Sequence, residues 1–275
     1  MFNNFLFLNE SIRFLGYIFY SFVKNFPSHN TPIKILIIIN LIQIMTIIKL
    51  YYLNDWKKIK SYGWQTICNK DLVALKSPYN LHRCNLCWDV YPESMLQEII
   101  AFYQDRPFFL YNRYDINSNY LLSEGKILEM KFETSNIKKI NCHQHDIMLL
   151  DTQDIYLWSK VLANAINKEH KLLFLFIKTI ATLKHSQFFL LYWQNMPVAT
   201  SLLSIYDNNA ILSFVTVDTQ FRARGLGRTI ILKTISFAYD IDIKTIYLYS
   251  ADRISHKYEK IGFTFINSLY LYRSV

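Results

Sequence analysis

The feature that most constrains this chain is a glycine-containing loop between an expected strand and an expected helix. The chain holds only six glycines in 275 residues, well below the roughly 7% of average proteins. Two of them stand in residues 222–228, RARGLGR, which follow the apolar run 210–217 and precede an amphipathic stretch ending near Tyr239. Glycine permits tight backbone geometry that other residues resist. The sequence therefore predicts a tight strand–loop–helix junction here.

The junction has the composition of an anion-binding site. The first N–H groups of a helix point outward and carry the positive end of its dipole. Glycines at 225 and 227 allow phosphate oxygens to approach the backbone, and Arg222, Arg224 and Arg228 add formal positive charge. The spacing is not a dinucleotide fingerprint, because position 230 is Ile. It is not a P-loop either, because no G-K-[ST] follows.

An Arg-x-x-Gly-x-Gly segment directly after a strand resembles the acyl-CoA pyrophosphate loop of the GNAT superfamily of N-acetyltransferases. Downstream, HKYEKIGF at residues 256–263 resembles the Tyr-x-Lys-x-Gly-Phe signature of that family. The resemblance covers residues 152–275. It implies an α/β fold with a mixed, mostly antiparallel GNAT-type sheet flanked by helices.

The resemblance also implies a reaction. Acetyl-CoA would be the co-substrate, and an amine of a small-molecule acceptor would attack the thioester directly, without a metal and without a covalent enzyme intermediate. Tyr258 matches the tyrosine that protonates the departing thiolate in many relatives, a role that suits a phenol; the alternative is that it packs or positions the thiol.

The resemblance further implies where CoA binds. Backbone amides of the loop would hold the pyrophosphate, and the preceding strand would pair with the pantetheine arm. One CoA contact is in doubt, because an asparagine common in the family is Ala251 here. The implied cofactor-binding residues are Val215, Val217, Arg222, Ala223, Arg224, Gly225, Leu226, Gly227 and Arg228.

No general base is evident from the sequence. The strand before the loop has no glutamate, and Asp218, Asp252 and His256 are candidates without support. An amine also needs little help if it arrives neutral or loses its proton through water. We expect His256 to lie on the surface of a helix.

The rest of the chain suggests three segments. Residues 151–275 form the acetyltransferase domain, and residues 51–150 weakly resemble the first half of tandem GNAT proteins. This degenerate GNAT-like N-terminal half lacks the loop, so we expect one CoA site, with the first half shaping the acceptor pocket or completing the fold. Local patterns predict a helix over residues 54–66 and a final pair of strands over 263–273.

Residues 1–50 form an apolar helical extension with three open interpretations. They are a hairpin packed on the protein, a monotopic membrane attachment, or a region upstream of a true start at Met45. The run 35–48 is apolar but shorter than the roughly 20 residues of a spanning helix.

The composition limits the binding partners and the cellular compartment that we expect for this protein. Four cysteines are too few for a disulfide scaffold and favour the reducing cytoplasm, unless residues 1–50 associate with a membrane. The spacing of Cys84, Cys87, Cys142, His143 and His145 argues against zinc, so no metal is expected.

The net charge of +9 is spread along the chain, and we do not expect a nucleic-acid partner. The alternatives to a small-molecule enzyme are acylation of a protein or aminoacyl-tRNA amine, and a CoA-binding or sensing module without turnover.

Overall fold

The protein is described by a computed structural model that covers residues 60, 62–68, 72–79, 85–88, 90, 94–104, 106–139, 147–150, 154–183 and 185–275. All of them belong to one compact unit, residues 45–275. The predictions for residues 1–50 lie outside the described residues, and so do Cys84, Cys142, His143 and His145. Within the described ranges, no helix combines the length and apolar character needed to cross a membrane.

The first half contributes short strands, one helix and one long strand. In α4 (Ser94–Tyr103) the buried residues Leu96, Ile99 and Tyr103 recur at helical spacing. The long strand β5 (Leu121–Glu133) is followed by the 3₁₀ helix η2 (Thr134–Lys139). The short strands are β1 (Gln65–Cys68), β2 (Val73–Lys76), β3 (Leu86–Trp88), β4 (Phe109–Asn112) and β6 (Ile147–Leu150).

The second half has two helices, a three-stranded meander and a helix–strand–helix–strand ending. Strand β10 alternates buried and half-buried residues along its length, as a strand between two layers does. The elements are α5 (Ile155–Ile166), α6 (His170–Ala181), β7 (Ser186–Trp193), β8 (Met196–Tyr206), β9 (Asn209–Val217), α7 (Leu226–Asp240), β10 (Thr245–Ala251), α8 (Asp252–Glu259) and β11 (Thr264–Ser274).

All described strands form one eleven-stranded sheet in the order β1-β2-β3-β4-β11-β5-β10-β9-β8-β7-β6. Only β3–β4 and β9–β10 pair in parallel among these strands, and every other neighbouring pair is antiparallel. The predicted fold class, a mixed and mostly antiparallel sheet flanked by helices, is therefore confirmed.

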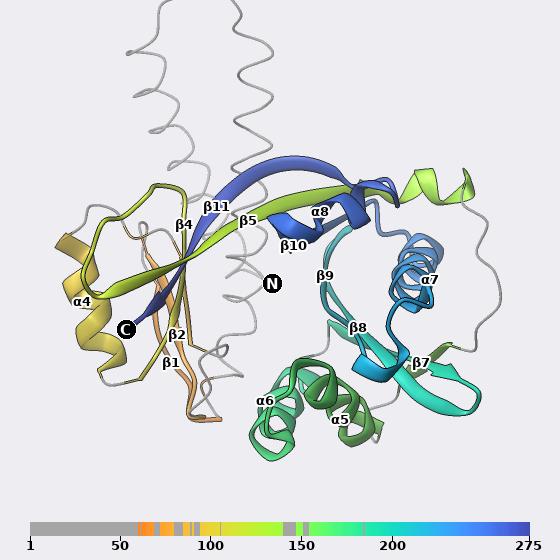
Figure 1. Cartoon of the computed structure of the whole chain (residues 1–275), viewed down its shortest axis with the longest axis horizontal. Coiled ribbons are helices and arrows are strands. Elements are labelled where there is room, and N and C mark those ends of the chain that lie inside the picture. Colours follow the sequence, from red (N-terminus) through yellow and green to blue (C-terminus); the bar gives the residue numbers. More distant parts are fainter. Residues whose placement is uncertain are drawn as a thin grey trace, which may run out of the picture. The chain divides into compact units, whose positions relative to one another are not determined.

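The two halves exchange strands within this sheet. Strand β5 of the first half lies between β10 and β11 of the second half, and β11 lies between β5 and β4 (Figure 1). The predicted final strand pair over residues 263–273 was therefore wrong: β11 is one continuous strand, and its partners come from the first half. The helix predicted over 54–66 also ends differently, because Gln65 and Thr66 belong to β1.

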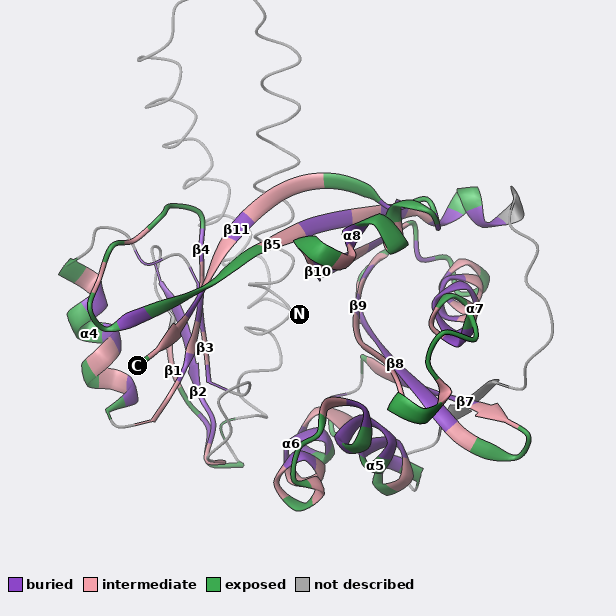
Figure 2. Ribbon diagram, in the orientation of Figure 1, coloured by how far each residue is buried: buried purple, intermediate pink, exposed green. Residues whose placement is uncertain are grey.

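Buried residues occur on strands and helices of both halves (Figure 2), and the cores that they form show the same exchange. Met130 and Phe132 of β5 are buried in a core that they share with α7 and β10. Tyr272 of β11 is buried in the core beneath α4. A third core joins Trp64 and Trp88 of the first half to α5 and α6. Each half thus completes its interior with side chains of the other.

We expect Phe132→Ala to destabilise the whole unit by about 3–5 kcal/mol, because a buried phenylalanine leaves a cavity when truncated. Phe132 is 1% exposed and its ring lies 5.3 Å from that of Phe263. The control Phe265→Ala removes a ring on β11 that is 57% exposed and should cost less than about 0.5 kcal/mol. Urea denaturation followed by circular dichroism measures both, and similar losses in the two variants would contradict the shared core.

Candidate functional site

The parallel strands β9 and β10 separate partway along their length and form a split in the sheet. Their pairing runs from Asn209 opposite Thr245 to Ile211 opposite Tyr247, although β9 continues to Val217 and β10 to Ala251. Beyond this point the strands separate. The backbone groups on the β10-facing edge of β9 are then available to a ligand, as at an open sheet edge.

A β-bulge in β9 changes the strand direction at the split. The register with β8 shifts between Thr200 and Leu202, and Phe214 opposite this shift has a φ of 49°. A left-handed aromatic residue costs roughly 1–3 kcal/mol, and such strain is concentrated at functional sites. Bulge and split coincide on residues 212–217, the segment that contains Val215 and Val217.

The loop after β9 leads into the start of α7. Asp218 caps a single 3₁₀ turn, because its Oδ1 accepts from the N–H of Gln220 at 3.1 Å. Ala223 and Gly225 both adopt left-handed conformations, with φ of 64° and 77°. Gly225 is the N-cap of α7, and its carbonyl accepts the N–H of Thr229 at 3.1 Å.

The N-terminus of α7 has a geometry that is suited to binding an anion. The N–H groups of Leu226, Gly227 and Arg228 precede the first donor within the helix, so they point out of its N-terminus. A Cβ built on Gly227 would lie 3.5 Å from Cγ2 of Val217, which places this turn against the end of β9. The loop predicted from the sequence therefore lies at the open end of the split.

The arginines of the loop do not act alike. Arg222 donates from Nη2 to the carbonyl of Ala165 at 2.7 Å and from Nε to the carbonyl of Val217 at 3.2 Å. It thereby ties the loop to the carboxyl end of α5, where a cation is favoured. This positioning role was not evident from the sequence, because it depends on a contact 57 residues away.

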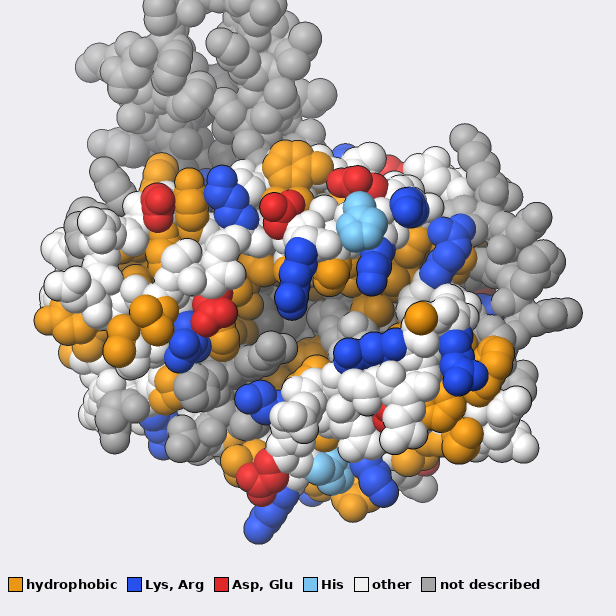
Figure 3. Space-filling model, viewed as in Figure 1, with side chains coloured by type: hydrophobic (Ala, Val, Ile, Leu, Met, Phe, Trp, Pro, Cys, Tyr) orange, Lys and Arg blue, Asp and Glu red, His pale blue; other side chains and the backbone are white. Residues whose placement is uncertain are grey.

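Arg224 and Arg228 are exposed beside the same helix start. The Arg224 guanidinium lies 5.8 Å from the centre of the Phe221 ring, and Arg228 donates to the carbonyl of Lys260 at 3.2 Å. Lys257 on α8 is exposed as well. Figure 3 shows Lys and Arg side chains gathering on the face where α7 and α8 lie. The surroundings of the loop are therefore cationic.

Tyr258 lies on α8 and packs against the core formed by α7 and β10. Its ring meets that of Phe263 edge-on at 5.8 Å. Burial raises the pKa of the Tyr258 phenol above its ordinary value of 10.0. The hydroxyl is consequently protonated at neutral pH and is able to donate a proton.

The base candidates named from the sequence do not converge on the split. The Asp218 carboxylate is used as the cap of the loop, and Asp252 and His256 are exposed on α8. Sequence reasoning missed a different carboxylate, Glu129 on β5, which is 2% exposed. It is one of three glutamates in β5, and nothing in the sequence distinguishes it from Glu124 and Glu133 as the buried one. No group of three or more potential metal ligands occurs in the described part of the chain.

Comparison with known proteins identifies the family of this region. Residues 159–272 match the family model described as an acetyltransferase (GNAT) domain. No curated protein matches the chain.

Solved structures match over both halves. A functionally unknown conserved protein from Staphylococcus epidermidis has a TM-score of 0.61 at 12% identity, with 78% of this chain and 94% of that chain covered. A GCN5-related N-acetyltransferase from Kribbella flavida has a TM-score of 0.57 at 11% identity, with coverages of 82% and 95%. A tandem GNAT protein from the clavulanic acid biosynthesis pathway has a TM-score of 0.51 at 6% identity, with coverages of 74% and 77%. At these identities the likeness shows the fold.

The two loop glycines should differ in their tolerance of alanine. Gly225→Ala forces a Cβ into a left-handed conformation and should lower the free energy of unfolding by about 1–2 kcal/mol. Gly227→Ala meets only an ordinary contact with Val217 within a helix, so stability should stay within about 0.5 kcal/mol or rise. Urea titration of both variants measures the difference, and equal losses would contradict the described loop geometry.

Proposed function

Residues 159–272 of the chain belong to the GNAT superfamily of acetyltransferases, and on that premise we propose that the protein transfers an acetyl group from acetyl-CoA to the amine of a small-molecule acceptor. The observation that carries the proposal is the helix start of α7 at the open end of the β9–β10 split. An anion cradle beside unpaired strand backbone suits a ligand with a pyrophosphate and an amide-containing arm.

The loop would bind the pyrophosphate of CoA. The outward N–H groups of Leu226, Gly227 and Arg228 donate to its oxygens, and Arg224 and Arg228 supply positive charge. Ala223 and Gly225 shape the loop through their left-handed conformations, and Arg222 holds it against α5. The three arginine side chains thus form or support the cradle, and the backbone makes the contacts.

The arm of CoA would then lie along the split. The backbone of Val215 and Val217 hydrogen-bonds the pantetheine amides, in place of the strand partner that β9 lacks beyond Ile211. This arrangement brings the thioester between the two strands. Acetyl-CoA acts as co-substrate, and the reaction requires no metal.

The chemistry is direct attack of the amine nitrogen on the thioester carbonyl. A C–N bond forms, the C–S bond breaks, and the nitrogen loses a proton. Tyr258 donates its phenolic proton to the departing thiolate and regains one from water. Burial raises the pKa of the phenol, so it is in the acid form before the reaction, but the same shift makes it a weaker acid.

A macromolecular acceptor is the second candidate, favoured by the net charge of +9. An aminoacyl-tRNA or a protein lysine would present the same amine to the thioester. Release of free thiol with tRNA or protein acceptors, and not with small amines, would identify this alternative. Binding of acetyl-CoA without thiol release on any acceptor would instead identify a sensing module.

Gly227→Glu should abolish measurable acetyl-CoA binding, because it places bulk and negative charge where the pyrophosphate would bind. The control Asn208→Glu adds the same charge at the exposed turn before β9 and should leave the affinity unchanged. Isothermal titration calorimetry of the two variants and the unmodified chain measures the dissociation constants. Unchanged affinity in the Gly227→Glu variant would overturn the assignment of the loop.

Tyr258→Phe should lower kcat about 10- to 1,000-fold while changing acetyl-CoA affinity less than about threefold, since only the proton donor is removed. An assay of thiol release gives kcat, and calorimetry gives the affinity for acetyl-CoA. An equal loss in both quantities would indicate that the tyrosine positions the ligand and donates no proton.

A further inference from the structure

The bulge in β9 shifts the alternation of the strand by one residue. Leu212, before the bulge, is buried in the core that contains α7, and Val215 and Val217, after it, pack against the same core. Residues three positions apart lie on opposite faces of a regular strand, so one extra residue stands between Leu212 and Val215. The register with β8 agrees, because Ser201 of β8 lies opposite both Phe214 and Val215 of β9.

The same shift sets the direction of the backbone groups after the bulge. The N–H of Asp218 donates to the carbonyl of Val198 on β8 at 2.8 Å. Backbone groups of successive residues point alternately to the two edges of a strand, so those of Thr216 also point to β8. Val215 and Val217 therefore direct their backbone groups to the opposite edge, which borders the split. The edge that would pair with the pantetheine arm thus depends on the bulge.

A buried threonine holds the bulge from the side of β8. Thr200 is fully buried, and its Oγ1 donates to the carbonyl of Phe214 at 3.0 Å. The same Oγ1 lies 2.7 Å from Oγ1 of Thr216. A hydroxyl has one proton, and that of Thr200 is used for the carbonyl, so Thr216 is the donor in the second bond. The Thr200 hydroxyl thus bonds a residue that the register between β8 and β9 skips.

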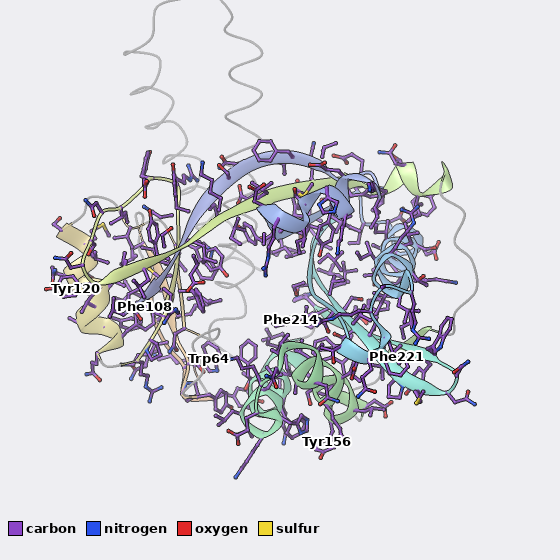
Figure 4. All side chains as sticks on the ribbon, viewed as in Figure 1. Trp64, Phe108, Tyr120, Tyr156, Phe214 and Phe221 are labelled. Atoms are coloured by element: carbon purple, nitrogen blue, oxygen red, sulfur yellow. The ribbon has the colours of Figure 1, made fainter. Side chains whose placement is uncertain are left out.

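The ring of Phe214 is fixed separately from its carbonyl. Phe214 lies beside the helix pair α5 and α6 (Figure 4), where its ring centre is 6.1 Å from that of Trp158 and 6.2 Å from that of Phe176. Its φ of 49° is costly for an aromatic residue and persists only where contacts hold it. The rings of α5 and α6 hold the side chain, and the hydroxyl of Thr200 holds the peptide group that follows it.

We propose that Thr200 is a positioning residue for acetyl-CoA, and that its hydroxyl keeps the bulge in the form that directs the backbone of Val215 and Val217 into the split. The inference rests on the proposed function. Because Thr200 is fully buried, it acts on the ligand only through the backbone of β9. Loss of the hydroxyl lets the Phe214 carbonyl rotate in search of another donor, and the edge of β9 then no longer matches the arm of CoA.

A second pair of hydroxyls in this protein supplies a matched control. Thr234 of α7 is also fully buried, donates to the carbonyl of Ile230 at 2.9 Å and lies 2.7 Å from the hydroxyl of Ser201. By the same reasoning, Ser201 is the donor in that second bond. Valine at either threonine therefore removes two hydrogen bonds of the same kind, but only the pair at Thr200 includes the bulge.

The test measures the affinity of the full chain for acetyl-CoA by isothermal titration calorimetry. Thr200→Val keeps the shape of the side chain and removes the hydroxyl, so the dissociation constant should rise about 5- to 50-fold. Thr200→Ser keeps the hydroxyl and should stay within about threefold of the unmodified chain. The control Thr234→Val should leave the dissociation constant unchanged. Urea denaturation of each variant shows whether it is folded.

The result that overturns the role of Thr200 is an unchanged affinity in the folded Thr200→Val variant. Equal losses in Thr200→Val and Thr234→Val, or in Thr200→Val and Thr200→Ser, would overturn it as well, because the hydroxyl at the bulge would then not be the cause. Absence of acetyl-CoA binding by the unmodified chain would instead overturn the proposed function itself.

A further variant decides the case if Thr200→Val does not fold. Thr216 is only half-buried, and Thr216→Val removes the donor that orients the Thr200 hydroxyl. The dissociation constant for acetyl-CoA should then rise at least about twofold. An unchanged value in this variant would overturn the positioning role.

Discussion

The pairing of β5 with two strands of the second half is the interaction on which the site depends. Strand β10 separates from β9 beyond Tyr247, so from there on only its hydrogen bonds with β5 keep it in the sheet. Residues Ile127 to Glu133 of β5 pair with β10 along its whole length, from Ala251 to Thr245. Because that ladder is complete, β10 can leave β9 and open the split without fraying.

The same strand arrangement explains how the two halves form one compact unit. β11 is paired on both edges, with β5 over Thr264 to Ser274 and with β4 at its carboxyl end. Side chains on these strands enter cores on both sides of the exchange, as Phe132 and Tyr272 do. Backbone and side-chain contacts therefore couple the halves through the same two strands.

Local features of the site were predictable from the sequence, and long-range ones were not. The loop at residues 222–228 and the start of α7 depend on residues close together in the chain, so spacing and glycine content were sufficient, whereas Tyr258 was found through the resemblance of residues 256–263 to a family signature. The role of Arg222 and the burial of Glu129 depend on partners that only the tertiary register brings near. The single strand β11 was mistaken for a pair because the apolar pattern of a strand does not reveal which strands it pairs with. At Gln65, tertiary contacts favoured a strand over the helix that the local pattern predicted.

The strand exchange has a consequence for how this fold can be divided. A fragment holding only residues 151–275 would keep the loop and Tyr258, but it would lose the strand that supports β10 at the split, and it would leave one edge of β10 and both edges of β11 unpaired. Such edges promote association between chains. The second half of this protein therefore depends on a strand of the first half for its solubility as well as its shape, and gene fusions or truncations that separate the two halves should yield aggregates.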